Sequence, residues 1–310
     1  MPLHEQLARL DAARELRGFK TEPRQMRAAA PGKIGALRLG FSVRDGRSIL
    51  HDLYRVAPLL VQQALYWDQA MPELPVCPII SIGGGILQGD RYKIDITVDA
   101  DACAQVTTQS ASRVHQMDAN YASQHQTITL KNGAYLEYLP DFTILYRDSR
   151  FINQTDIILA EDATLLYGEM ILVGRKHHRA EERFGFDLLS LGVSVRRPCG
   201  RPLFTEKILI EKTRFHDSAA VMRGYDAFAN IMCLTSPELA ARIKARFETN
   251  FATPAPRVMS GVSLLPNRAG LMLRAVGMET HDVRHEVRRF WGLVREEVRG
   301  RTLPPACLWR

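Results

Sequence analysis

The sequence predicts a mainly β fold built from strand-turn-strand units, with two or three short α-helices, two of them towards the C-terminus. Apolar and polar residues alternate over residues 94–99, which is typical of a half-buried strand. In addition, the pattern I-x-[VL]-x-x-[DG]-A occurs three times, ending at Ala102, Ala134 and Ala163. Each copy is followed by another apolar, strand-like run, so each unit is expected to form two strands joined by a tight turn.

The spacing of these units bears on how they pack. The three alanines are 32 and 29 residues apart, a period within the range of stacked repeat architectures. One such unit cannot bury its own apolar face, so stacking the units into a β-solenoid would bury it. An antiparallel meander or sandwich also produces strand-turn-strand units. The periodicity by itself leaves both arrangements open.

The N-terminal residues 1–30 are expected to form an extension to a single β-rich domain over residues 31–310. Apolar residues recur at helical spacing from Leu7 to Leu16, which predicts a short amphipathic helix. A frayed tail and an arm that docks on a partner are both compatible with this pattern.

Strand patterns begin at about residue 35, where the turn pair Asp45-Gly46 predicts a hairpin. A further strand over residues 76–82 enters a loop with four glycines between Gly83 and Gly89. Glycine adopts positive φ without steric cost, so this loop is expected to turn tightly or to lie against another segment.

A glycine-rich loop also raises the possibility of phosphate binding. The spacing of Gly84 and Gly89 matches the first half of a P-loop, which continues with lysine, serine or threonine, and a helix. Here Asp90 and Arg91 follow, and then a strand. A carboxylate at that position would repel phosphate, which argues against nucleotide binding.

Two helices are predicted near the C-terminus. Ser236 is a suitable N-cap, with proline next to it, for a helix near 236–249. A second helix near 282–299 has an apolar stripe and ends at Gly300. Residues 264–274 between them are expected to form a hairpin.

Composition and charge exclude several classes of protein. The 310 residues carry a formal net charge of +7, but lysine and arginine are dispersed among acids, so no nucleic-acid surface is predicted. No apolar run approaches the roughly 20 residues of a membrane span, and no secretory signal is present, so a cytoplasmic location is expected. The five cysteines show no C-x-x-C spacing, so neither a disulfide framework nor a zinc site is indicated.

Four polar residues stand in or beside apolar runs: Asp90, Ser112, Glu169 and Glu206. A buried carboxylate is costly unless it has a partner or water. These residues could therefore be strand residues that face solvent or form structural ion pairs, or they could line a polar passage. The adjacent His177 and His178 would point to opposite faces of an extended segment, so we expect a solvated surface turn rather than a metal site, with contact to a partner as the alternative.

Several motifs occur in an order that resembles the UreD (UreH) family of urease accessory proteins, over roughly residues 31–310. These motifs are Gly84 to Asp90, Thr107 to Val114, Leu136 to Pro140, Gly174-Arg175 with Glu181 to Gly185, and Leu303-Pro304 with Leu308 to Arg310. The resemblance implies a mainly β protein wound in a solenoid-like manner with a couple of helices. It therefore favours the β-solenoid over the meander or sandwich.

The resemblance also implies roles for individual residues. Members of the family have an internal tunnel that is thought to carry nickel. The family's residues associated with this tunnel correspond to Asp90, Ser112, Glu169 and Glu206 in this sequence, which are therefore the candidate tunnel-lining residues. Arg113 and Arg175 are candidate supporting residues, and Trp309 and Arg310 are candidate docking residues. One departure is Ser81-Ile82-Gly83, where many members have His-Pro-Pro, so a role of that histidine cannot be transferred.

The function implied by the resemblance is that of a non-enzymatic scaffold and chaperone in urease maturation. Such a protein would bind the helical accessory protein UreF and the GTPase UreG, dock on apo-urease, and assist assembly of the dinickel centre. No tightly bound cofactor is expected, only transient passage of Ni²⁺.

Two other functions remain open from the sequence. A β-solenoid enzyme acting on carbohydrates could use Glu169 and Glu206 as an acid and base, if their carboxyl groups lay roughly 5–10 Å apart in a cleft. A β-rich interaction protein unrelated to urease is the other alternative.

Overall fold

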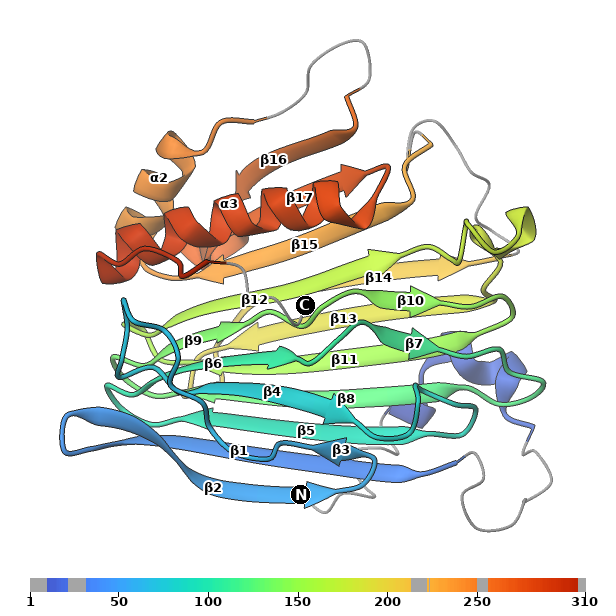
Figure 1. Cartoon of the computed structure of the whole chain (residues 1–310), viewed down its shortest axis with the longest axis horizontal. Helices are drawn as coiled ribbons and strands as arrows, with labels where there is room; N and C mark the ends of the chain where they lie inside the picture. The colour runs from blue at the N-terminus through green and yellow to red at the C-terminus, as the bar shows by residue number, and fades with distance from the viewer. Residues whose placement is uncertain (1–9, 22–31, 213–221, 223, 250–255, 306–310) are drawn as a thin grey trace.

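The computed structural model describes residues 10–21, 32–212, 222, 224–249 and 256–305. Within these residues the strands form two open sheets, sheet A with seven strands and sheet B with ten (Figure 1). In spatial order, sheet A contains β14 (Pro202–Glu211), β13 (Leu188–Arg196), β11 (Arg150–Leu159), β8 (Ala122–Leu130), β5 (Arg91–Val98), β1 (Ile34–Arg44) and β2 (Arg47–Val56). The main path of sheet B contains β16 (Val258–Leu264), β17 (Gly270–Gly277), β15 (Ala227–Leu234), β12 (Thr164–Leu172), β9 (Tyr135–Tyr138), β6 (Cys103–Thr108), β4 (Val76–Ser81) and β3 (Leu59–Leu60). Two short strands, β7 (Ser112–Val114) and β10 (Thr143–Leu145), pair with each other, and β10 also pairs with β12.

The three sequence repeats stack on one another in register. Ile96 of β5 lies opposite Ile128 of β8, and Ile128 lies opposite Ile157 of β11, in parallel ladders. The second strand of each unit, β6, β9 or β12, crosses to sheet B and forms a parallel ladder there. The predicted strand-turn-strand units are therefore confirmed.

The mainly β prediction is confirmed, whereas a solenoid is not confirmed for the whole chain. At the outer edges the pairing changes to antiparallel, as between β1 and β2, between β13 and β14, and along β12, β15, β17 and β16. The turn Asp45-Gly46 closes the β1–β2 hairpin as predicted, with positive φ at both residues. Neither sheet closes on itself in the described part of the chain.

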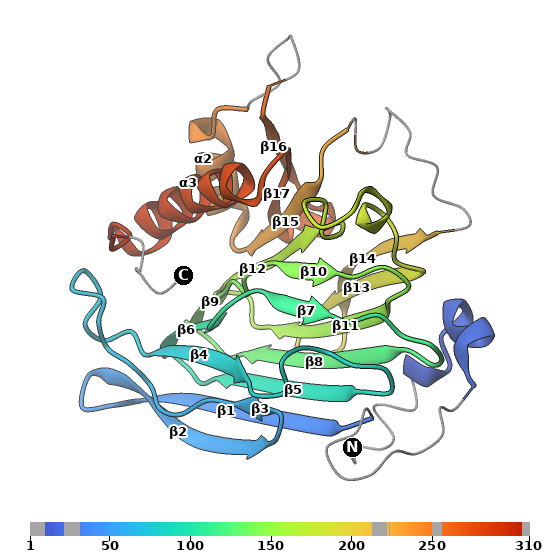
Figure 2. The same ribbon diagram turned by 45° about the vertical axis from the view of Figure 1, so that its right-hand side comes forward.

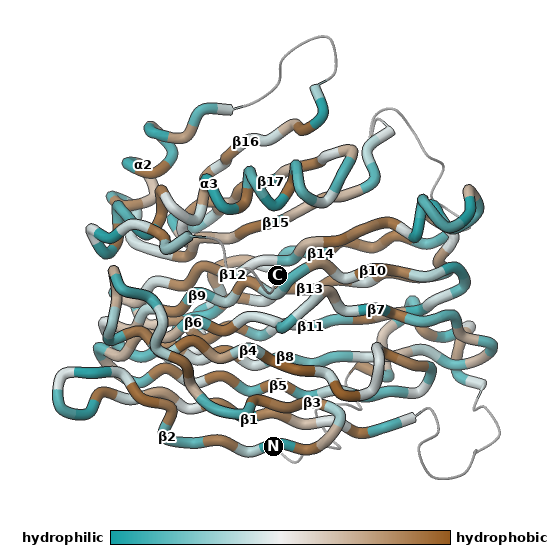
Figure 3. Tube along the Cα trace, in the orientation of Figure 1, coloured by the Kyte–Doolittle hydropathy of each residue, from teal (hydrophilic) through white to brown (hydrophobic). Residues whose placement is uncertain are grey.

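The largest apolar core lies between the two sheets. Alternate strand residues such as Val98, Ile128 and Leu165 point into it, and Figure 3 shows the corresponding alternation of hydrophobic and hydrophilic residues along the strands. A second core lies between sheet B and two helices, α2 (Pro237–Arg246) and α3 (Thr280–Arg299). These helices cover β15, β16 and β17 on the side away from sheet A (Figure 1).

Local sequence signals account for both helices. The Ser236 hydroxyl accepts a hydrogen bond from the Leu239 backbone N–H at 3.3 Å, so the predicted N-cap is confirmed. Helix α3 begins two residues before the predicted start and ends at Gly300, which adopts the left-handed conformation with φ of 63°. The predicted hairpin over 264–274 corresponds to β16, a 3₁₀ turn η3 (Pro266–Arg268) and β17.

The described part of the N-terminal extension packs against this chain's own sheet A. It contains a 3₁₀ helix, η1 (Arg14–Phe19), drawn in blue beside the sheet in Figure 2. Leu16 is fully buried in a small cluster with Ile152 and Leu188. Glu15 accepts hydrogen bonds from Ser190 and Lys207, both at 2.7 Å.

Another short 3₁₀ helix, η2 (Ala180–Glu182), lies in the loop after β12. Within the described ranges, none of the helices has the length and apolarity to span a membrane.

Candidate functional site

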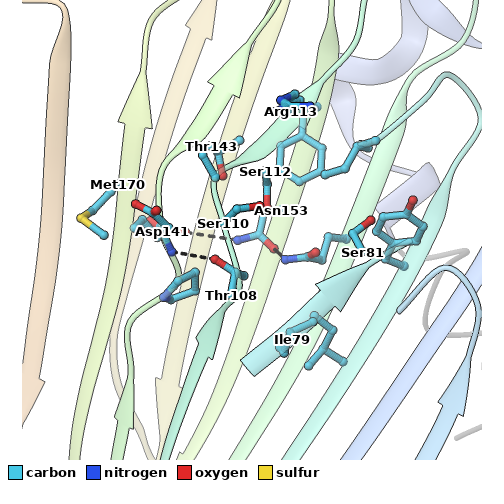
Figure 4. A pocket seen from close by; sticks show the side chains of 18 of the residues that line it. Ile79, Ser81, Thr108, Ser110, Ser112, Arg113, Asp141, Thr143, Asn153 and Met170 are labelled. Atoms are coloured by element: carbon cyan, nitrogen blue, oxygen red, sulfur yellow. Dashed lines mark hydrogen bonds between the residues drawn. The ribbon is translucent and has the colours of Figure 1, made fainter. Parts of the chain in front are cut away.

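A cavity of about 190 Å³, which we call the inner cavity, lies between the two sheets. Both sheets contribute polar side chains to its wall, among them Gln124, Gln126 and Asn153 from sheet A and Tyr138, Tyr167 and Glu169 from sheet B. Figure 4 shows the side chains from the two sheets pointing towards one another. The exposed Ser110 and Arg113 also line it, so the inner cavity reaches the surface there.

The glycine-rich loop forms part of the mouth of the inner cavity. Gly85 has a φ of 145°, and a Cβ atom there would lie 2.6 Å from Nε2 of His115 and 2.7 Å from the Arg113 carbonyl oxygen. Only glycine therefore lets the loop lie so close to β7, where Ile86 pairs with Val114. A strand, β5, follows the loop as predicted, in place of the helix that a P-loop requires.

Asp90 holds this loop in place. Its side chain is 1% exposed, one carboxylate oxygen accepts the Lys33 N–H at 2.9 Å, and the other accepts the Leu87 N–H at 2.9 Å and the Tyr92 hydroxyl at 2.7 Å. Burial and the neighbouring carboxylate raise the pKa of Tyr92, so the phenol remains a donor. Asp90 is not among the residues that line the inner cavity.

Glu169 is a buried carboxyl group in the wall of the inner cavity. Its Oε1 accepts hydrogen bonds from the Tyr167 hydroxyl at 3.0 Å and from Nδ2 of Asn153 at 3.2 Å. The amide oxygen of Asn153 in turn accepts from Gln124 at 3.3 Å and from Gln126 at 3.2 Å. The network links β8, β11 and β12, so it fixes the orientation of Glu169 across the gap between the sheets.

The electrostatic environment of Glu169 differs from that of a surface acid. Burial raises its pKa to about 7, and the hydrogen bonds from Tyr167 and Asn153 offset only part of this effect. Near neutral pH the group is therefore partly protonated, and a small change in its surroundings changes its charge. Such a group can exchange its proton for a cation.

A row of polar side chains leads from Glu169 to the edge of the molecule. In sheet B, Glu169 lies opposite Asn230, and Asn230 lies opposite Arg274. Arg274 forms an ion pair at 2.5 Å with Glu206 of sheet A. The negative charge of Glu206 contributes to the raised pKa of Glu169. Asn230 is 5% exposed, and its Nδ2 atom has no hydrogen-bond acceptor.

The predicted site residues therefore separate into groups. Three of them line the inner cavity, namely Ser112, Arg113 and Glu169. Three others, Asp90, Glu206 and Arg175, do not line it. Arg175 forms an ion pair with Glu182 at 2.5 Å, and its guanidinium lies 3.8 Å from the centre of the Tyr146 ring. Trp309 and Arg310, the predicted docking residues, lie outside the described residues.

The other candidates for metal binding are placed as follows. His177 lies in a turn, and its side chain is 80% exposed. Its Nε2 atom lies 3.6 Å from Oε2 of Glu279. His178 is also exposed. Cys77, Cys103 and Cys233 are buried free thiols, whereas Cys199 is exposed. In the part of the chain that the structure describes, no three or more His, Cys, Asp or Glu side chains are grouped as ligands of one ion.

Sequence reasoning missed the amide residues of the cavity wall. Asn153 and Gln124 each stand four residues before the first isoleucine of a repeat, and Gln126 stands two residues before one. Side chains at even spacing along a strand share one face. Extending the aligned repeats four residues upstream would therefore have predicted that these amides face the same side as the buried isoleucines.

Comparisons with known proteins agree with the motifs in the sequence. A family model described as UreD urease accessory protein matches residues 33–310. The chain is 72% identical to Urease accessory protein UreD 3 of Methylorubrum populi, over the full length of both proteins. It is 47% identical to Urease accessory protein UreD of Yersinia enterocolitica, over 96% of this chain and 93% of that protein. The chain therefore belongs to the UreD family of urease accessory proteins.

Proposed function

We propose that this protein is a non-enzymatic maturation factor that docks on apo-urease with UreF and UreG and assists the insertion of nickel. Membership of the UreD family supports a role in urease maturation, since the relatives carry the name urease accessory protein. In this proposal the inner cavity is a passage for Ni²⁺ on its way to the dinickel active site.

The observation that carries the proposal is the position of Glu169 in the wall of the inner cavity. Its carboxyl oxygens, with the hydroxyl and amide oxygens nearby, are hard ligands that bind Ni²⁺ less tightly than thiolate or imidazole groups do. A cation that displaces the proton of Glu169 would be held weakly and released again. This chemistry suits transfer of an ion better than its storage.

The proposal also assigns roles to the partners. The glycine-rich loop of this chain does not form a P-loop, because Asp90 and a strand stand where a P-loop has lysine and a helix. Nucleotide binding would therefore be the task of the GTPase UreG. The exposed faces of α2 and α3, together with the C-terminal Trp309 and Arg310, are the surfaces that we propose for docking.

The test is the nickel content of urease in cells that express the urease operon at a fixed nickel supply. Without this protein we expect normal amounts of urease protein with little nickel. Glu169→Ala should lower the nickel content several-fold. The matched control is Glu161→Ala, which alters an acid whose side chain is 79% exposed, and it should leave the content unchanged.

Each result has a distinct meaning. Full nickel loading without this protein would overturn the maturation role. Full loading with Glu169→Ala would overturn the passage and leave the maturation role standing. Accumulation of each variant must be measured alongside, so that loss of protein is not taken for loss of transfer.

No observation favours a carbohydrate-cleaving enzyme. That chemistry needs two carboxyl groups facing one accessible cleft. The candidate pair does not meet this requirement, because Glu169 lines the inner cavity but Glu206 does not, and Glu206 forms an ion pair with Arg274. Asp141 also lines the inner cavity, but its carboxylate is paired with Arg284.

A further inference from the structure

A second cavity, of about 340 Å³, lies on the face of sheet B that points away from sheet A. We call it the outer groove. Strands β4 and β6 form its floor, and helix α3 forms one wall. Most of its lining is apolar, including Leu65, Val76, Ile80, Val287 and Trp291.

The outer groove and the inner cavity share the lining residues Thr108, Gln109, Asp141 and Met170. These residues form the partition between the two spaces. Figure 4 shows Thr108, Asp141 and Met170 on one side of the inner cavity.

Sheet B has a break at this partition. Strand β6 ends at Thr108 and β7 begins at Ser112, while β9 ends at Tyr138 and β10 begins at Thr143. The segments between these strands are loops, so no continuous ladder of backbone hydrogen bonds separates the two cavities there. The loops are joined by the Asp141 N–H, which donates to the Thr108 hydroxyl at 2.9 Å, and by the Ser112 N–H, which donates to the Phe142 carbonyl oxygen at 2.8 Å.

Asp141 is the charged group in the partition. It is 8% exposed, and its Oδ1 accepts the Phe142 N–H at 2.8 Å. The same oxygen accepts a hydrogen bond from Arg284 of α3 at 2.7 Å. Arg284 lines the outer groove but not the inner cavity, so its guanidinium covers Asp141 from the outer side.

The charges of this pair would act on a cation that approaches the partition. With Arg284 in place, the carboxylate is neutralised, and a divalent cation approaching from the outer groove meets a positive charge. With Arg284 displaced, a carboxylate shared by both cavities would attract the cation to the break in the sheet.

We propose that the outer groove is the entrance for a divalent cation to the inner cavity, and that the Arg284–Asp141 ion pair is the gate between them. The proposal rests on the proposed function, because the cation is the nickel that the inner cavity would carry. This proposal adds the face of the molecule from which the cation enters and the ion pair that closes the entrance.

The experiment measures the initial rate of nickel incorporation into urease, after a short pulse of nickel, in cells that carry single and double variants. Arg284→Gln removes the positive charge and should raise the rate several-fold. Asp141→Asn removes the attracting carboxylate and should lower it several-fold. The double variant should behave like Asp141→Asn, because the gate has no effect without the carboxylate.

Two further variants make the result specific. Arg284→Lys keeps the charge and should keep the rate near that of the unmodified protein. Arg38→Gln breaks a similar exposed pair, between Arg38 and Asp52 at 2.7 Å on sheet A, and should leave the rate unchanged. Rates are expressed per amount of soluble variant, so that poor accumulation does not mimic a closed gate.

Opposite effects of the two single variants support the gate. Equal losses in both would show that the pair only holds α3 in place, and rates equal to that of Arg38→Gln would show that the entrance lies elsewhere. Either result overturns the gate. If Glu169→Ala lowers the nickel content in the same cells, the proposed passage survives the failure of the gate; if it does not, the passage itself has failed.

Discussion

Glu169 is buried and accepts hydrogen bonds from Tyr167 and Asn153, and no lysine, arginine or histidine of the described residues forms an ion pair with it. Other acids in this chain have a lowered pKa, because a positively charged side chain lies beside them. The Arg175 guanidinium, for example, lowers the pKa of Glu182. The pKa of Glu169, by contrast, is raised to about 7 because burial dominates.

The raised pKa predicts how stability depends on pH. Because the folded protein holds this proton more tightly than the unfolded chain, the contribution of Glu169 to the free energy of unfolding falls as pH rises from about 4.5 to about 7. A shift of this size corresponds to about 3 kcal/mol. Glu169→Gln should remove that loss, so the variant should gain stability relative to the unmodified protein as the pH rises from 5 to 8.

Urea unfolding of both proteins at several pH values measures this difference. Comparing the two proteins cancels the opposite contributions of acids such as Glu182, whose pKa values are lowered. A constant difference in the free energy of unfolding between pH 5 and pH 8 would contradict the raised pKa of Glu169.

At the scale of the elements, helix α3 is joined to sheet B by a buried cluster of charges. Arg295 is fully buried and donates to both carboxylate oxygens of Glu137 on β9, at 2.7 and 2.6 Å. It also donates to Asp68, in the segment between β3 and β4. One guanidinium thus connects three segments that are far apart in the sequence.

Removing Arg295 should therefore be costly. Arg295→Ala leaves two buried carboxylates without their partner, and a loss of about 3–5 kcal/mol in the free energy of unfolding is expected. Denaturant unfolding measures the loss. The control Arg38→Ala, which breaks an exposed pair, should cost at most about 1 kcal/mol. If the two losses were equal, the Arg295 cluster would have no special role in holding α3.

At the scale of the whole molecule, the N-terminal segment packs on the outer face of sheet A, and helices α2 and α3 pack on the outer face of sheet B. The inner cavity lies between the sheets, while the outer groove lies under α3. The proposed path of nickel therefore crosses sheet B and not sheet A.

The small N-terminal cluster should open separately from the sheets. Leu16→Ala removes its fully buried leucine, and a local loss of about 2–3 kcal/mol is expected. Limited proteolysis should then cut near residues 10–21 while the two sheets stay protected. Leu264→Ala, at a leucine that is 52% exposed, is the control. Equally rapid cleavage within the sheets would show that the N-terminal segment does not open on its own.

Many elements could be predicted because their signals are local. The Asp45-Gly46 turn, the Ser236 cap and the Gly300 stop each depend on neighbours in the sequence, and all three stand in the structure as predicted. The repeats also showed which strands are equivalent. Their register in sheet A, with Ile96, Ile128 and Ile157 side by side, follows from burying the same face in each unit.

The candidate site was less predictable, since its residues come from strands that are distant in the sequence. Polar residues inside apolar runs pointed to Asp90, Glu169 and Glu206 alike, yet only Glu169 lines the inner cavity. Asp90 accepts hydrogen bonds from the backbone N–H groups of Lys33 and Leu87, and Glu206 forms an ion pair with Arg274. Neither partner can be identified from spacing along the chain.

The sequence by itself thus determined the family, the mainly β fold, the stacking units and the two C-terminal helices, because family motifs, period-two alternation and caps are written in neighbouring residues. Only the tertiary structure decided which of the candidate acids lines the inner cavity and that Asp141 is paired with Arg284. Those relations depend on how the two sheets face one another and on where α3 places Arg284 beside Asp141, and both are set by packing between distant segments.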